Sequence, residues 1–225
     1  TVICSDKTGT LTRNEMTVRE VTTAADRYHV TGAGYAPRGE FLRAADAGGS
    51  PARDRGRGVN VAATPDLHRL LEVAARCTTA HVEPGPDGGK WRVIGDPTEG
   101  ALLVAALKGG VAAGDRAIFE IPFDSERRRM SVVVRGRDGR RSLEIKGAPE
   151  AVLPRCTSEM RDGAAVPLTD ARRGEILAAA AGMADRALRV LALACRDLAA
   201  DEGVDPEPER MERDLVWLGL AGMVD

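Results

Sequence analysis

Aromatic residues are scarce in this sequence, and neither sign of charge is in excess. Phe, Trp and Tyr make up 3% of the 225 residues, so the core must be built mainly from Val, Leu, Ile and Ala. Lys and Arg number 32 against 34 Asp and Glu, which gives a net charge of −2. This balance disfavours electrostatic binding of nucleic acid, in spite of several local arginine clusters.

Cysteine pairs and long apolar runs are also lacking. The four cysteines are scattered, without any Cys-x-x-Cys pair: Cys4, Cys77, Cys156 and Cys195. This spacing disfavours zinc sites and disulfides, and it favours free thiols in a reducing cytosol. No run approaches the ~20 apolar residues that cross a bilayer. We therefore expect no membrane span and, because the first residues already read as a strand, no signal peptide.

The first twelve residues combine a predicted buried strand with groups suited to phosphate chemistry. Thr1–Cys4 is short, apolar and partly β-branched, as strands of parallel sheets are. Asp6 would stand at the carboxyl end of that strand, where open α/β sheets bind ligands. Lys7 and Thr8 offer donors for a phosphoryl group, and an ionised aspartate can accept phosphate as a nucleophile. The alternative is an ordinary capped turn.

The uninterrupted run Asp-Lys-Thr-Gly-Thr-Leu-Thr at 6–12 resembles the phosphorylation signature of the P-type ATPases, the ion pumps that cycle through an aspartyl phosphate. The resemblance implies that Asp6 is the phosphate acceptor and that Lys7 and Thr8 contact the transferred group. It also implies ATP as substrate and a Mg²⁺ ion held with the help of Asp6 and Thr8.

Strands and helices are predicted along the rest of the chain. Alternation and turn residues predict hairpins at 16–30 and 81–94, and Thr64-Pro65 opens a helix that ends near Cys77. Residues 32–60, rich in Gly and Arg, predict a mobile surface loop. Further strands are expected at 118–123, 130–134, 142–146, 188–194 and 214–225, and helices after Asp96-Pro97, at Pro149 and after Thr169.

Two strings in the middle of the chain strengthen the resemblance. Gly-Asp-Pro-Thr-Glu-Gly-Ala-Leu at 95–102 is similar to the family's segment beside the nucleotide, which implies that Glu99 accepts a hydrogen bond from adenine. Taken alone, Asp96 and Glu99 would be helix caps. Phe-Asp-Ser-Glu-Arg-Arg-Arg-Met-Ser at 123–131 and Lys-Gly-Ala-Pro-Glu at 146–150 also match the family. They imply that Phe123 stacks on adenine, while Lys146 and Gly147 line its pocket.

The cationic residues allow two interpretations. The run 127–129 offers guanidinium groups for phosphates, or else a solvated strand edge. Arg128 stands where many relatives carry lysine. Arg196 ends the string Leu-Arg-Val-Leu-Ala-Leu-Ala-Cys-Arg, which resembles the family segment whose arginine reaches toward the nucleotide phosphates. Its alternative role is a salt bridge at the end of a strand.

The fold expected from the resemblance is α+β. A mostly antiparallel sheet flanked by helices would form a nucleotide-binding domain at 15–222. Residues 1–14 would contribute one strand and the phosphate-accepting loop of a neighbouring α/β phosphorylation domain, and 223–225 the return hinge to it. The expected partners are ATP and the remainder of the same polypeptide, with its phosphorylation, actuator and transmembrane domains, at the cytosolic face of a membrane. Neither nucleic acid nor direct membrane contact is expected.

The motif variants resemble the calcium-pump branch, and no His-Pro pair of the heavy-metal branch occurs. Two other classes remain open. A free-standing aspartate phosphatase would need a second aspartate at Thr8, and a non-catalytic interaction domain should have lost Phe123, Lys146 or Arg196. We expect this segment alone to bind ATP without completing phosphorylation, because the family's other magnesium-binding motifs follow further along the polypeptide.

Overall fold

The computed structural model describes residues 15–44, 58–86, 90–112, 114 and 117–225. The expected phosphorylation segment, with Asp6, Lys7 and Thr8, lies outside these residues, as do residues 45–57 of the Gly- and Arg-rich stretch. None of the helices in the described ranges is both long and apolar enough to cross a membrane.

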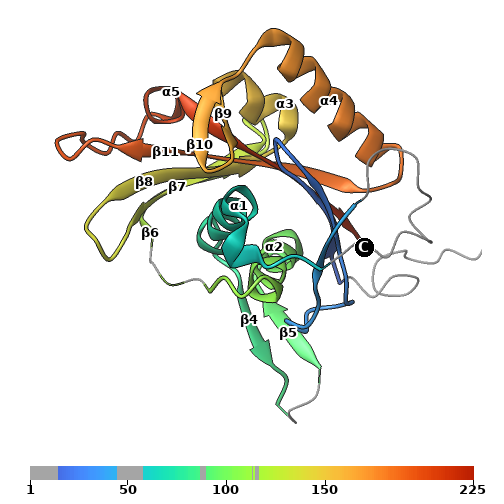
Figure 1. The fold of residues 1–225 in the computed structure, drawn as a ribbon. Coiled ribbons are helices and arrows are strands. Elements are labelled where there is room, and N and C mark those ends of the chain that lie inside the picture. Colours follow the sequence, from blue (N-terminus) through green and yellow to red (C-terminus); the bar gives the residue numbers. More distant parts are fainter. Residues whose placement is uncertain (1–14, 45–57, 87–89, 113, 115–116) are drawn as a thin grey trace, which may run out of the picture.

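One large sheet of ten strands dominates the described chain (Figure 1). Its main order is β3-β2-β1-β12-β11-β8-β7-β6, and β9 joins β12 and carries β10. The β9–β12 pairing is parallel, whereas the others are antiparallel, so the expected α+β class is confirmed. The strands are β1 Thr17–Thr22, β2 Arg27–Val30, β3 Phe41–Arg43, β6 Ala117–Asp124, β7 Arg129–Arg135, β8 Arg141–Gly147, β9 Cys156–Arg161, β10 Ala164–Pro167, β11 Arg189–Leu198 and β12 Leu215–Val224.

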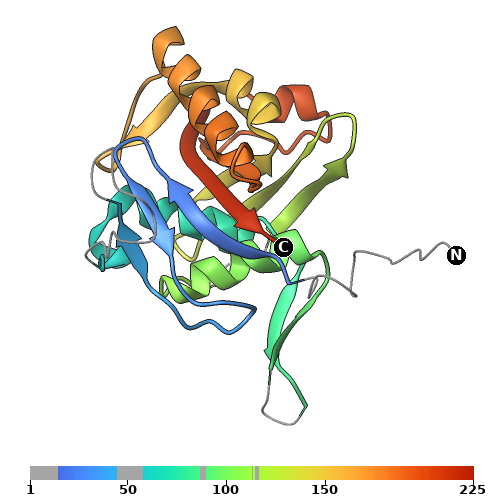
Figure 2. The same ribbon diagram turned by 90° about the vertical axis from the view of Figure 1, so that its right-hand side faces the viewer.

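Helices cover both faces of this sheet (Figures 1 and 2). On one face lie α1 (Pro65–Arg76) and α2 (Pro97–Lys108), and on the other lie α3 (Pro149–Val152) and α4 (Asp170–Ala184). We call these the α1–α2 face and the α3–α4 face. The short helix α5 (Pro208–Met211) precedes β12, and 3₁₀ turns occupy Val61–Ala63 and Leu153–Arg155. A separate hairpin of β4 (His81–Pro84) and β5 (Trp91–Ile94) projects beside α2.

Alternation along the central strands divides the interior into two cores. Met130 and Val132 of β7 pack on the α1–α2 face, and Val133 packs on the other. On β8, Ile145 belongs to the α3–α4 core, so its neighbours Glu144 and Lys146 point toward α1 and α2. Two charged side chains are thereby buried beneath the helices.

The two ends of the described domain lie together. Thr17 of β1 pairs with Val224 of β12, and β12 is a central strand between β1 and β11. The strand expected at 214–225 is β12, and it is part of this sheet. A hinge at this end of the domain would involve chain segments that are adjacent at Thr17 and Val224.

Local signals placed most elements correctly. Asp96 caps α2 as predicted, accepting hydrogen bonds from the backbone of Thr98 and Glu99. Thr64 occupies the N-cap position of α1, but its hydroxyl donates to the carbonyl of Asn60 and makes no hydrogen bond to the α1 amides. The expectation of a loop over 32–60 is wrong at β3, where buried Phe41 pairs with Val30.

Candidate functional site

A buried ion pair joins β8 to α2 on the α1–α2 face. Lys146 Nζ lies 2.9 Å from Glu99 Oε1, with the two side chains 7% and 11% exposed. Lys146 also donates to the carbonyl of Cys77, 2.5 Å away. Burial disfavours the charged form of Glu99, but the charge and hydrogen bond of Lys146 and the donors of Thr79 outweigh it and lower the pKa of Glu99. Both sequence-predicted residues are thus brought into direct contact.

Glu99 also organises the segment that follows α1. Its Oε2 accepts hydrogen bonds from Thr78 Oγ1 (3.2 Å), from both the amide (2.7 Å) and the hydroxyl (2.9 Å) of Thr79, and from the amide of Ala80 (3.2 Å). The interpretation of Glu99 as a cap of its own helix is therefore wrong, since Asp96 has that role. Oε1 accepts from Lys146, and this is the carboxylate oxygen with room for another donor.

Gly147 ends β8 where strand β7 approaches closely. A Cβ built there would lie 2.5 Å from the carbonyl oxygen of Arg128 and 2.5 Å from Arg129 Cβ. A side chain at this position would collide with the backbone of the β6–β7 turn. The absence of a side chain therefore keeps the end of β8 against that turn, next to Lys146.

Phe123 lies near the end of β6, and Arg128 lies in the turn that joins β6 to β7. A bulge between Ile121 and Asp124 sets Asp124 opposite Arg129, which places the preceding Phe123 on the same face as Met130 and Lys146. Phe123 is 62% exposed, although most large apolar side chains of the described chain are buried. Two strand spacings, about 10 Å, separate it from β8.

The three consecutive arginines at 127–129 have different environments. Arg128 adopts a left-handed backbone (φ 53°) and is exposed, with NH1 2.6 Å from Glu150. Arg127 and Arg129 instead turn to the α3–α4 side and bind the fully buried Glu212, at 2.9 and 2.6 Å. For Arg127 and Arg129, both sequence interpretations, phosphate contacts and a solvated edge, are therefore wrong, because these guanidinium groups tie β7 to the segment after α5.

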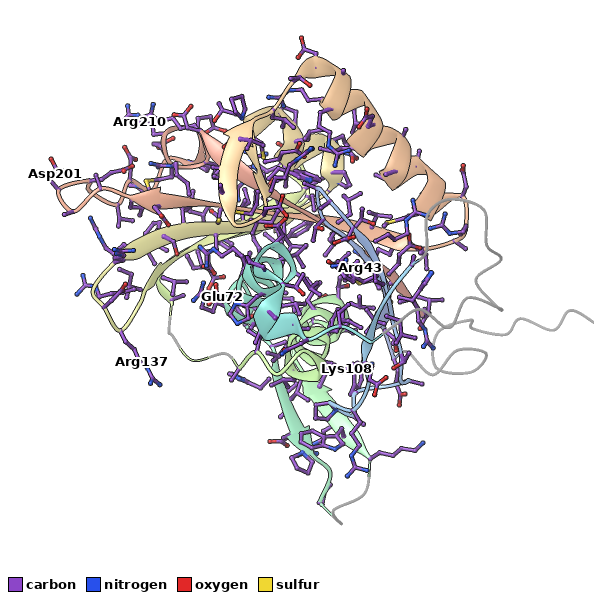
Figure 3. The ribbon with its side chains drawn as sticks, viewed as in Figure 1. Arg43, Glu72, Lys108, Arg137, Asp201 and Arg210 are labelled. Carbon is purple, nitrogen blue, oxygen red and sulfur yellow. The ribbon has the colours of Figure 1, made fainter. Side chains whose placement is uncertain are left out.

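Arg196 lies apart from the Lys146–Glu99 pair. It pairs with Leu143 on β8 and points to the α3–α4 side, where it meets Glu202 at 2.8 Å and the carbonyl of Met211 at 3.2 Å. This is the salt bridge that the alternative interpretation predicted. Asp201, labelled in Figure 3, precedes Glu202 in the loop that joins β11 to α5.

A second arginine on β11, Arg189, was not selected from the sequence. It lies closer than Arg196 to the position of β11 that pairs with Gly147. Ala192 pairs with Gly147, and Arg189 is three residues earlier, beyond the end of β8. Leu191 and Leu193 pack on the α1–α2 face, so alternation puts exposed Arg189 on that face too. Odd- and even-numbered residues of a strand point to opposite faces of the sheet, so Arg189 and Arg196 lie on opposite faces. This alternation is the signal in the sequence that could have identified Arg189.

Metal-binding geometry is not found in the described ranges, where no group of three or more His, Cys, Asp or Glu side chains comes together. The residues expected to hold Mg²⁺, Asp6 and Thr8, lie outside those ranges. The described site is therefore a combination of one exposed aromatic ring, a buried lysine–carboxylate pair, a glycine at a close approach and an exposed arginine.

Comparison with known proteins identifies the family of this chain. Residues 66–225 match the family described as P-type ATPase, cytoplasmic domain N. The whole chain is 38% identical to part of a calcium-transporting ATPase of Bacillus subtilis and 38% identical to part of a cation-transporting ATPase of Synechocystis, covering 24% of each. It is 35% identical to 21% of a calcium-transporting ATPase type 2C member 1 of Bos taurus.

The chain thus spans about a quarter of the length of these relatives. The matches cover 100% of the chain, including the Asp-Lys-Thr-Gly-Thr run that prompted the resemblance. These matches confirm the resemblance to the P-type ATPases that the motifs indicated. This chain belongs to the P-type cation-transporting ATPases and comprises their cytoplasmic domain N.

Proposed function

We propose that this chain binds ATP on the α1–α2 face and presents its γ-phosphate to Asp6 in an ATPase that drives cation transport at the cytosolic side of a membrane. The observation that carries the proposal is the placement of exposed Phe123 on the face that holds the buried Lys146–Glu99 pair. A purine needs an apolar surface for its ring and a few polar groups at its edge, and this face offers both.

Each residue then has a physical role. The ring of Phe123 stacks on adenine, while Lys146 and the free lone pair of Glu99 Oε1 meet the polar edge of the base. Gly147 leaves the end of β8 without a side chain, so the base can lie against the backbone. Arg189, and Arg128 if it releases Glu150, extend toward the phosphates.

The proposed transfer step is attack of the Asp6 carboxylate on the γ-phosphorus, which breaks the bond to the β-phosphate oxygen and leaves ADP. Positioning and charge neutralisation supply most of such a transfer. Mg²⁺ held by Asp6 and Thr8 would neutralise the phosphate oxygens, and Lys7 would add a further positive charge. The segments near residues 14 and 225 would form the hinge by which the domain closes on the acceptor, with other magnesium ligands coming from the remainder of the polypeptide.

Calorimetric titration with ATP tests the base-binding role. Stacking on an aromatic ring is worth roughly 1–3 kcal/mol, so Phe123→Ala should weaken ATP by about ten-fold or more. Ile118→Ala is the matched control, because Ile118 is another exposed apolar residue of β6, 47% exposed. Unchanged affinity in Phe123→Ala, or an equal loss in the control, would contradict the role of the ring.

A second titration distinguishes the two arginines of β11. If Arg189 meets phosphates, Arg189→Ala should weaken ATP more than AMP, and Arg196→Ala should leave the ratio unchanged. If only Arg196→Ala shows the ATP-specific loss, the prediction from the sequence is right and the assignment from strand parity fails. Lys146→Ala should weaken the binding of ATP and of AMP alike, because the proposed contact of Lys146 with the nucleotide is to the adenine base.

A further inference from the structure

Glu144 is a buried carboxylate on β8 to which the proposed site assigns no role. Its side chain is 0% exposed and lies on the same face as Lys146, two residues away. Its Oε1 accepts from Arg76 NH2 at 2.5 Å, from Arg69 NH1 at 3.3 Å and from Ser142 Oγ at 3.2 Å, while Oε2 accepts from Arg76 Nε at 3.2 Å. Both arginines belong to α1, whose Glu72 is labelled in Figure 3.

Arg76, which binds Glu144, directly precedes the chain segment that contacts Lys146 and Glu99. Arg76 is the last residue of α1, and the next carbonyl, that of Cys77, accepts from Lys146. Two and three residues further, the amides of Thr79 and Ala80 donate to Glu99. The segment 77–80 therefore supplies the other contacts of both charged residues, and it begins where Glu144 holds the helix.

We propose that Glu144 is a positioning residue for the nucleotide base: by holding Arg76 it fixes segment 77–80, and through that segment the orientation of Lys146 and Glu99. The nature of the ligand rests on the function proposed above. The bidentate contact of Arg76 with Glu144 has one favourable geometry, because both N–H···O hydrogen bonds are kept only when the guanidinium and the carboxylate stay aligned. An apolar contact at this place would hold the helix but would tolerate sliding.

The test is calorimetric titration of Glu144→Gln with ATP, ADP and AMP, alongside amide hydrogen exchange of the full chain. The variant keeps the size of the side chain and removes its charge. We expect all three nucleotides to weaken alike, by about ten-fold, because the contact acts on the base and not on the phosphates. Exchange at the Thr79 and Ala80 amides should become faster, as their acceptor Glu99 loses its fixed position.

A matched variant separates positioning from a general loss of stability. Glu159 is another buried carboxylate with two guanidinium partners, Arg161 at 2.8 Å and Arg172 at 2.9 Å, on β9 and α4. Glu159→Gln should destabilise the fold comparably and leave nucleotide affinity unchanged. Arg76→Gln should reproduce the Glu144→Gln loss, and the double variant should lose no more than either single one, since the two residues act as a unit.

The outcomes distinguish this inference from the proposed function. If the unmodified chain binds no adenine nucleotide, the proposed function fails, and exchange at Thr79 and Ala80 still decides whether Glu144 positions the segment. If the chain binds ATP and Glu144→Gln weakens it no more than Glu159→Gln does, the positioning role is overturned. If Glu144→Gln does not fold, Arg76→Lys replaces it, because lysine keeps the positive charge and cannot make the bidentate contact. Wild-type nucleotide affinity and wild-type amide exchange in Arg76→Lys would overturn the positioning role of Glu144.

Discussion

Replacing Glu99 with glutamine should destabilise the fold strongly, because it breaks an ion pair that has almost no contact with water. The side chains of Lys146 and Glu99 are 7% and 11% exposed, so the pair belongs with buried salt bridges. Removing one partner of such a bridge costs about 3–5 kcal/mol, against ~0.2–1 kcal/mol for exposed pairs. A glutamine oxygen can still accept from Thr79 and Ala80, but its NH₂ group would then face the Lys146 ammonium, donor against donor.

Urea denaturation monitored by circular dichroism measures the loss. With a slope of about 3 kcal/mol per M, a loss of about 3 kcal/mol lowers the midpoint by about 1 M. The double variant Glu99→Gln/Lys146→Met removes the unpaired ammonium as well, and it should be more stable than Glu99→Gln alone. A loss below about 1 kcal/mol would place the pair among exposed salt bridges and refute the reasoning.

The same contact predicts how stability depends on acidity. Because the pKa of Glu99 is lowered in the folded chain, its contribution is fully present above the pKa of an unfolded glutamate and is lost as the pH falls through the lower folded value. The difference between the wild type and Glu99→Gln should therefore shrink on acidification and be constant near neutral pH. A difference that grows as the pH falls would contradict the sign.

Two further predictions concern glycine and cysteine. Gly147→Ala should destabilise by about 1–3 kcal/mol in urea, because its Cβ would lie 2.5 Å from the Arg128 carbonyl oxygen. Gly174→Ala, in helix α4 with nothing within 4 Å of the added Cβ, should instead stabilise the fold by about 0.5–1 kcal/mol. If both variants were less stable than the wild type, the space around the Cβ would not decide whether alanine stabilises or destabilises. Burial raises the pKa of Cys77 and of Cys156 to about 12, so both should resist alkylation at pH 8 in the folded chain and react in urea. Mass spectrometry of the labelled peptides checks this, and rapid native labelling of Cys77 would contradict its burial.

Elements with a local signal were predictable from the sequence. The Asp96 cap, the proline after it and the glycine at 109 define α2, because capping involves only neighbouring backbone groups. Strands β7 and β8 were likewise predicted at 130–134 and 142–146, on either side of a glycine-bearing turn. Strands β3, β9 and β10 were missed, because such short segments of three to six residues become strands only when a neighbouring edge is available.

The site shows the same division. Its motif strings identified Phe123, Lys146 and Glu99, and the structure places them on one face of the sheet, whereas their contact with a nucleotide stays a prediction. The arginines at 127–129 could not be ranked from the sequence, because a guanidinium group pairs with whichever carboxylate the fold brings to it. Arg129 finds Glu212, 83 residues away, where the sequence shows only an acidic loop.

By itself the sequence determined the family and the order of most elements. These properties depend on the residues themselves and on their near neighbours, since capping, period and motif act within a few positions. Only the tertiary structure decided which charges meet. The pairing of Lys146 with Glu99 and of Glu144 with Arg76 requires that α1 and α2 lie over β8, and that arrangement results from burying the apolar face of the whole sheet.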